Sequence, residues 1–364
     1  MLTRRELIRG AATTVAFLGV SGQASATEDS LRARAAASGL IYGCATKSSL
    51  LKRDPSYAQA LIRDAGILAP EWELKRTAVQ PKEGRWDFSG FDYVAAFGHM
   101  HNMKLRGHTF VWYTENPPWL EQALAERPSE NLLTDYVFEG GKRYRGHMHS
   151  WDVVNEAIEP DQGDVAGLRI NSPWYKAFGP RYIDLAFQAA READPNCLLF
   201  YNDYSTEMDC AIDERRRTAV LKLLENLKSR NVPIDGFGMQ SHLKPFQYGL
   251  DQRILARFVQ EIHGMGLKIL ITELDVADIG GPQRIAIRDA QIGSVTKNFL
   301  DVVLQNPSTL GVLTWGISDK YSWLSTYPAY KWPNGQLSRG LPLDASFRRK
   351  PMWDAIASAF DARR

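Results

Sequence analysis

The chain has 364 residues, of which 44% are hydrophobic and 24% charged, with 44 lysines and arginines against 42 aspartates and glutamates. This balance leaves a formal net charge of only +2, which argues against a basic surface for nucleic acids or acidic membranes. The three cysteines, Cys44, Cys197 and Cys210, do not form a disulfide framework. The length allows either two average domains or one large barrel.

Residues 1–26 are typical of an export signal rather than of a folded segment. Arg4 and Arg5 precede an apolar run over 11–20, and a small-x-small cleavage site ends at Ala26. The apolar run is too short to span a bilayer. We therefore expect a twin-arginine signal peptide cleaved after Ala26, with export to the periplasm or the medium and no stable membrane association afterwards. An uncleaved membrane anchor is the alternative.

The remaining residues, 27–364, are predicted to form one domain in which strands alternate with helices. Apolar residues recur at steps of three and four, as at Ile183, Ala186, Phe187 and Ala190, which indicates helices with one apolar face. Between such patterns lie eight strand-like runs: 40–45, 67–71, 105–111, 151–155, 198–202, 234–240, 268–273 and 311–316. This alternation predicts a single (β/α)8 TIM barrel. A doubly wound open sheet is the alternative, but no Gly-x-Gly-x-x-Gly follows the first strand.

Polar or aromatic side chains stand at the predicted carboxyl ends of these strands. They are Glu71 and Lys75, His108, Asn155 and Glu156, Asn202 and Tyr204, Gln240 and His242, Glu273 and Asp275, and Trp315. In a barrel these ends converge on one mouth, where active sites lie. Two glutamates at the ends of buried strands, Glu156 and Glu273, are what hydrolysis of a glycosidic bond requires. Ion-paired strand ends are the structural alternative.

Six motifs, taken together and in order, resemble glycoside hydrolase family 10, the family of endo-β-1,4-xylanases. The resemblance covers about residues 40–357 and implies a (β/α)8 barrel that hydrolyses xylan or xylo-oligosaccharides with retained anomeric configuration. The motifs are Gly107-His108-Thr109-x-x-Trp112, Trp151-Asp152-Val153-Val154-Asn155-Glu156, Asn202-Asp203-Tyr204, Asp235-Gly236-x-Gly238-x-Gln240-Ser241-His242, Thr272-Glu273-Leu274-Asp275 and Thr314-Trp315-Gly316-x-x-Asp319-x-x-Ser322-Trp323.

Matched onto these motifs, Glu156 resembles the family's general acid/base and Glu273 its nucleophile. His242 resembles the histidine that hydrogen-bonds the nucleophile. Asp275 lies two residues beyond Glu273 on the same face of a strand, and its pairing with His242 would keep Glu273 ionised. We expect the charge of Glu273 to raise the pKa of Glu156. In a retaining enzyme the two carboxyl groups lie roughly 5 to 5.5 Å apart.

The other residues of the predicted mouth are expected to hold sugar. Hydrogen bonds to hydroxyl groups of the ring being cleaved are expected from His108, Asn155, Asn202 and Gln240. Flat faces for sugar rings, or else ordinary core packing, are expected of Trp112, Trp315 and Trp323. The loop 321–332, rich in Tyr and Trp, either forms part of the binding wall or packs on itself. The predicted set is completed by Glu71, Lys75 and Tyr204.

The sequence departs from the family pattern on the glycone side. The family usually has Glu-Asn-x-Met-Lys-Trp after the second strand, whereas this chain has Glu71-Trp72-Glu73-Leu74-Lys75-Arg76. Trp72 therefore replaces an asparagine that contacts the second glycone sugar. Tyr113 and Glu115 replace the usual histidine and glutamine after the third strand. Our hypothesis is that binding beyond the cleaved residue is weakened, or retuned toward substituted xylans.

Three alternatives to a xylanase remain. A metal hydrolase would use the pairs His99/His101 and His147/His149, but both precede strands and so belong to the face opposite the mouth. A non-catalytic carbohydrate-binding barrel would have lost its carboxylates, which are present here. Activity on another β-1,4-glycan, such as cellulose or mixed-linkage glucan, stays open, as does endo versus exo preference. We expect a monomer without metal or cofactor.

Overall fold

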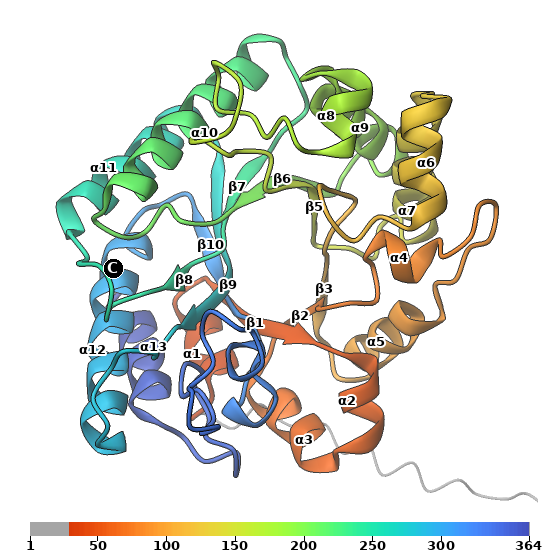
Figure 1. Ribbon diagram of the computed structural model, residues 1–364. Coiled ribbons are helices and arrows are strands. Elements are labelled where there is room, and N and C mark those ends of the chain that lie inside the picture. The colour runs from red at the N-terminus through yellow and green to blue at the C-terminus, as the bar shows by residue number, and fades with distance from the viewer. Residues whose placement is uncertain (1–28, 364) are drawn as a thin grey trace, which may run out of the picture.

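The centre of the computed structural model, which describes residues 29–363, is a closed barrel of eight parallel strands (Figure 1). Its strands are β1 (Ile41–Thr46), β2 (Ile67–Pro70), β3 (Lys104–Gly107), β5 (Ser150–Asn155), β6 (Leu198–Asp203), β7 (Gly236–Met239), β9 (Lys268–Val276) and β10 (Thr309–Thr314). Pairing of β10 with both β9 and β1 closes the barrel. Two short strands flank its mouth: β4 (Val111–Trp112) pairs with β5, and β8 (His242–Leu243) pairs with β9. The predicted TIM barrel is confirmed, whereas the predicted signal peptide lies outside the described residues.

Helices surround the barrel (Figure 1). Their bounds are α1 (Leu31–Ala37), α2 (Ser48–Arg53), α3 (Pro55–Asp64), α4 (Arg76–Val79), α5 (Ser89–Met100), α6 (Pro118–Glu126), α7 (Asn131–Arg143), α8 (Pro173–Phe178), α9 (Arg181–Ala193), α10 (Ala211–Ser229), α11 (Gln252–Gly264), α12 (Ile285–Val303) and α13 (Pro351–Asp361). The predicted apolar faces are buried, as Phe258, Val259 and Ile262 of α11 show. No helix within residues 29–363 is both long and apolar enough to cross a membrane.

Three predicted strands end two or more residues from the predicted position, all at the mouth. The strand predicted over 105–111 ends at Gly107, because the Thr109 hydroxyl and the Phe110 amide both turn to donate to the Asp152 carbonyl. The strand predicted to end at 273 continues to Val276, where β8 pairs with it. The last strand, β10, ends at Thr314, two residues earlier than predicted, and Gly316 has a positive φ of 103° that no strand adopts.

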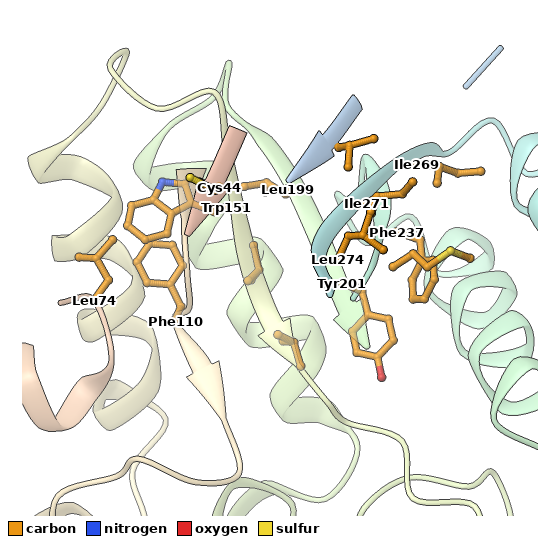
Figure 2. Close-up of a cluster of buried hydrophobic side chains, with 14 of the residues drawn as sticks. Cys44, Leu74, Phe110, Trp151, Leu199, Tyr201, Phe237, Ile269, Ile271 and Leu274 are labelled. Carbon is orange, nitrogen blue, oxygen red and sulfur yellow. The ribbon is translucent and has the colours of Figure 1, made fainter. Parts of the chain in front are cut away.

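The core beneath the mouth is built on β5, whose residues are all buried. The Trp151 ring stacks on Phe110 with centroids 3.9 Å apart and the planes 17° from parallel (Figure 2). Gly107 of β3 lies opposite Trp151 in register, and a Cβ there would stand 1.9 Å from the indole. The indole therefore requires glycine at position 107. Cys44 is fully buried nearby.

Gly107→Ala should lower the free energy of unfolding by about 3 kcal/mol or more, because the added methyl group has no space beside Trp151. Gly264→Ala is the matched control: it lies in α11 with nothing within 4 Å of an added Cβ. There alanine should be neutral, or stabilise by up to about 1 kcal/mol. Denaturant titrations of both variants measure the difference, and equal midpoints would contradict this packing.

Candidate active site

Two glutamates stand at the mouth of the barrel, at the ends of two strands that β6 and β7 separate in the sheet. Glu156 directly follows β5, and Glu273 lies within β9 near its carboxyl end. Glu156 adopts a φ of +58°, in the left-handed region that a residue with a side chain rarely occupies. Such backbone strain persists only where the surroundings hold it, and it is concentrated at functional sites.

Amide side chains join the two carboxylates into one hydrogen-bond network. The Asn155 amide donates to Glu156 Oε1 at 3.0 Å, and the Asn202 amide donates both to Asn155 Oδ1 and to Glu273 Oε1, each at 2.8 Å. The Gln240 amide donates to Glu156 Oε1 at 3.0 Å as well. Glu156 and Glu273 therefore belong to a single polar site, in which each has several donors.

Asn202 positions other residues of the site, and its predicted contact with a sugar hydroxyl stays a prediction. Its side chain is fully buried, its amide nitrogen donates to two acceptors, and its oxygen accepts the Thr272 hydroxyl at 2.7 Å. Both N–H groups of this amide therefore donate within the site, and its oxygen accepts one hydrogen bond. Asn202 fixes Glu273 relative to Asn155.

The surroundings of Glu273 keep it ionised. His242 Nε2 lies 3.3 Å from Glu273 Oε2, and its Nδ1 lies 2.8 Å from Asp275 Oδ1, so the predicted His–Asp pair is present. Burial raises the pKa of Glu273, but the hydrogen bond from His242, the charges of His108 and His242 and the Asn202 amide outweigh it, and the pKa is lowered. Burial lowers the pKa of His242, but its two carboxylate partners raise it well above the usual value. The imidazole is therefore a cation beside the carboxylate.

The surroundings of Glu156 favour its protonated form. Its pKa is raised, mainly by burial, although the hydrogen bonds from Gln240 and from the Trp112 indole, at 2.9 Å, lower it. The predicted direction is confirmed, but the predicted cause was incomplete. Burial raises the pKa of Glu156 more than either neighbouring charge does. The charge of Asp203 raises it more than the charge of Glu273 does. Asp203 was not among the predicted site residues.

His108 is fixed from inside the barrel. Its Nδ1 lies 3.0 Å from Asp152, which also forms a buried ion pair with Arg106 of β3. The His108 ring stands edge-on to Trp315, with centroids 5.2 Å apart. Trp315 is only 8% exposed, so most of its indole serves packing and a small part reaches the mouth.

Arg169, which sequence reasoning missed, clamps the turn that carries Glu156. Its Nε donates to the Glu156 carbonyl at 3.0 Å, and its Nη2 donates to the Ile158 carbonyl at 3.2 Å and to the Tyr204 hydroxyl at 3.1 Å. The ring of Tyr113 lies 3.9 Å from its guanidinium. Tyr113 and the predicted Tyr204 thus belong to the support of the acid. An isolated arginine in a loop carries no sequence pattern that points to this role.

The loop after β2 lies beside the acid. Glu71 forms an ion pair of 2.7 Å with Lys47. The Lys75 ammonium lies 4.8 Å from the Trp112 ring and 5.6 Å from the Trp72 ring. Trp112 donates to Glu156. A row of contacts therefore leads outward from that carboxylate through Trp112 and Lys75 to Trp72. Glu115, in contrast, accepts the Thr77 hydroxyl at 3.1 Å and so links its loop to α4.

The first part of the aromatic loop 321–332 packs on itself, and its predicted place in the binding wall stays a prediction. Trp323 donates its indole N–H to Asp275 at 2.6 Å and packs edge-on to His242, and Tyr327 and Tyr330 surround it. Trp332 is buried beneath the Arg288 guanidinium, 4.5 Å away. The first part therefore lies beside Asp275 and His242, and the end packs against α12.

The two histidine pairs considered for a metal lie near each other, with the rings of His99 and His147 5.5 Å apart. They precede β3 and β5, at the end of the barrel away from Glu156 and Glu273. In the described chain, residues 29–363, no group of three or more His, Cys, Asp or Glu side chains could hold a metal ion.

Comparisons with known proteins place this site in context. The sequence model of glycosyl hydrolase family 10 matches residues 30–359. Endo-1,4-beta-xylanase B of Thermotoga neapolitana is 31% identical over 311 residues, which cover 84% of each chain. A thermostable celloxylanase of Thermoclostridium stercorarium is 32% identical, covering 83% of this chain and 82% of that protein. The crystal structure of xylanase 10B from Thermotoga petrophila RKU-1 in complex with xylobiose superimposes with a TM-score of 0.80, at 29% identity, over 91% of this chain and 97% of that one.

His242→Ala should raise the pKa of Glu273, because the carboxylate loses a hydrogen-bond donor and a neighbouring positive charge. Titration of the glutamate carboxyl groups by 13C NMR measures the shift in the folded protein. His263→Ala is the matched control, since His263 contacts Ser308 and neither glutamate. A Glu273 pKa that stays unchanged or falls in His242→Ala would contradict the role given to this pair.

Proposed function

Because this chain belongs to glycosyl hydrolase family 10, we propose that it hydrolyses internal β-1,4-xylosidic bonds of xylan with retention of anomeric configuration. The observation that carries the proposal is the pair Glu156 and Glu273, held in one network but with pKa values shifted in opposite directions. Double displacement needs such a pair, one carboxyl group protonated and one ionised.

In the first step Glu273 attacks the anomeric carbon and forms a glycosyl ester, while Glu156 gives its proton to the departing oxygen. In the second step Glu156 takes a proton from the water that cleaves the ester. The cationic His242 holds Glu273 in its attacking orientation. The hydrogen bonds of Trp112 and Gln240 to Glu156 favour its ionised form, which the second step needs.

The proposed substrate is a xylan or xylo-oligosaccharide. It is supported by the names of the relatives and by the xylobiose bound to the similar Thermotoga petrophila enzyme. The similarity to a celloxylanase favours a second candidate, hydrolysis of other β-1,4-glucans by the same two carboxylates. Export remains part of the proposal, because the paired arginines and the short apolar run of residues 1–26 suit a twin-arginine signal.

Reducing-sugar release from xylan, mixed-linkage glucan and cellulose tests the proposal. Xylan should be hydrolysed fastest, with oligosaccharides of intermediate length as early products. Faster release from cellulose would favour the second candidate. Sugar binding without release from any of the three would contradict both and leave the carbohydrate-binding alternative.

Glu156→Ala and Glu273→Ala should each reduce xylan hydrolysis by at least about a thousandfold while the protein stays folded. Added azide should restore turnover of an activated xyloside by Glu273→Ala, because azide fits the space of the lost carboxylate and attacks from the same side. The product should be the glycosyl azide of inverted configuration, which NMR identifies. Glu83→Ala is the control, because Glu83 is exposed and pairs with Arg127. A retained azide product from Glu273→Ala would overturn the assignment.

The pH dependence of kcat/KM should be bell-shaped, rising as Glu273 ionises and falling as Glu156 loses its proton. Trp112→Phe removes a hydrogen bond that lowers the pKa of Glu156, so this pKa should rise. The alkaline limb should then move to higher pH, while the acid limb stays in place. Trp119→Phe is the control, because its indole N–H donates to the Gln80 carbonyl instead. Movement of the acid limb alone would contradict the assignment of Glu156.

A further inference from the structure

Another buried glutamate, Glu207, lies in the loop between β6 and α10, and only 2% of it is exposed. Its Oε1 accepts the amide N–H of Ser241 at 2.9 Å, and its Oε2 accepts the amide N–H of Thr206 at 2.8 Å. The Thr206 hydroxyl also donates to Oε1, at 3.2 Å. The Glu207 carboxylate therefore joins the loop after β6 to the segment after β7.

Ser241 lies outside the regular strands, between the end of β7 at Met239 and the start of β8 at His242. It is fully buried, so its amide N–H needs an acceptor inside the protein. A buried N–H that loses its acceptor destabilises the backbone position that it occupies. Glu207 supplies this acceptor in place of a paired strand.

The backbone of Ser241 is strained. Its φ of +64° lies in the left-handed region, which is unfavourable for a residue with a side chain. Such a conformation persists only where the surroundings hold it. Three hydrogen bonds do so here: the Ser241 hydroxyl donates to the Met239 carbonyl, the Asp275 amide donates to the Ser241 carbonyl, and the Ser241 amide donates to Glu207. Of the three acceptors, only Glu207 is a side chain that a substitution can remove.

The residues on either side of Ser241 each serve one of the two catalytic glutamates. The Gln240 amide donates to Glu156 Oε1 at 3.0 Å. His242 Nε2 lies 3.3 Å from Glu273 Oε2. Because both side chains are attached next to Ser241, a rotation of its backbone would displace them together.

The charge of Glu207 has less reach than its hydrogen bonds. Burial raises the pKa of Glu207, as does Asp213 of α10, while its two amide donors and the charge of His242 lower it. Glu207 is not among the main causes of the pKa shifts of the two catalytic glutamates. The other charged groups that face these residues stay in place in the variants below: Asp203, Asp213, Asp275 and His108. Any effect of Glu207 on the catalytic glutamates therefore passes through the segment 240–242.

We propose that Glu207 is a positioning residue for the hydrolysis, because it holds Ser241 in its strained conformation. By holding Ser241 it keeps the neighbouring Gln240 and His242 against the two catalytic glutamates. This inference rests on the proposed function and deepens it, since it names what sets the alignment of the proposed acid and nucleophile. Glu207 acts through the backbone and not on the substrate.

The test compares Glu207→Gln and Glu207→Asp with the wild type. Glutamine keeps the length of the side chain but turns one acceptor toward a backbone N–H into a donor. Aspartate keeps the charge but shortens the reach of the carboxylate. Asp194→Asn is the matched control: Asp194 is 3% exposed and accepts the amide N–H groups of Gly146 and Asn196, but it lies between α9 and β6, at the other end of the barrel.

Both substitutions of Glu207 should lower kcat on xylan about ten- to hundredfold, because misplaced catalytic groups cost rate. KM should change less than about threefold, because the loss falls on the transition state. Weakening the bond from Gln240 should raise the pKa of Glu156, and displacing His242 should raise the pKa of Glu273. Both limbs of the pH profile of kcat/KM should therefore move to higher pH, whereas Asp194→Asn should move neither.

The proposal is overturned if both Glu207 variants match Asp194→Asn in kcat and in both limbs. A fall in kcat with both limbs in place also overturns it, because a general loss of packing lowers activity without shifting these pKa values. Movement of one limb alone contradicts it as well, since Ser241 lies between both neighbours. Thermal unfolding checks that each variant is folded.

A second substitution, Ser241→Gly, tests the link between Glu207 and the strained residue. Glycine adopts a φ of +64° without strain, so Ser241→Gly should lessen the need for Glu207. Glu207→Gln should therefore lower kcat by a smaller factor in the Ser241→Gly background than in the wild type. If Glu207→Gln does not fold, the double variant should fold. An equal factor in both backgrounds, or a double variant that also fails to fold, overturns the proposal.

An NMR titration keeps this result separate from the proposed function, because it needs no substrate. The carboxyl groups of Glu156 and Glu273 are titrated by 13C NMR in the wild type, in the Glu207 variants and in Asp194→Asn. Higher pKa values for both glutamates in the Glu207 variants alone support the proposal even if the wild type cleaves no xylan, in which case only the proposed function fails. Unchanged pKa values overturn the proposal, whatever the wild type does to xylan.

Discussion

The site depends on a small set of hydrogen-bonded amides that hold two buried carboxylates in different protonation states. Asn155 and Asn202 connect Glu156 to Glu273, so neither carboxylate moves independently of the other. Burial alone would raise both pKa values and leave two neutral acids. The cationic His242, anchored on Asp275, breaks that symmetry by favouring the charge on Glu273 only. The different chemical roles follow from where one imidazole is placed.

The barrel supplies this arrangement at a conformational cost. Glu156 stands directly after a buried strand in a left-handed conformation, and Arg169 holds its carbonyl from the loop that follows. Arg216 donates to the carbonyl of Ile158, two residues on, and pairs with Asp203, so a second arginine supports the same turn. Glu156 is thus held both through its backbone carbonyl and through its carboxylate.

The barrel, its helices and most residues of the mouth could be predicted from the sequence, because strand and helix periodicities and the positions of strand ends are local patterns. The residues that support the site were harder to predict from the sequence. Arg169 and Asp203 act through contacts made across loops, and nothing in their immediate neighbours indicates those contacts. Asn202 was identified, but its contacts with Thr272, Asn155 and Glu273 exist only in three dimensions and were not predicted. Strand ends near the mouth were misplaced because contacts distant in sequence decide them, as the pairing of β8 with β9 and the bonds of Thr109 and Phe110 to Asp152 show.

Strand β5 carries closely spaced residues with unrelated duties: Trp151 fills the core, Asp152 orients His108, and Asn155 donates to Glu156, which directly follows the strand. A shift of this strand that repaired packing would displace the acid as well. Laboratory evolution of new substrate preferences should therefore find few tolerated changes in β5. Productive variation should accumulate instead at exposed positions such as Trp72, which can change without moving the two glutamates.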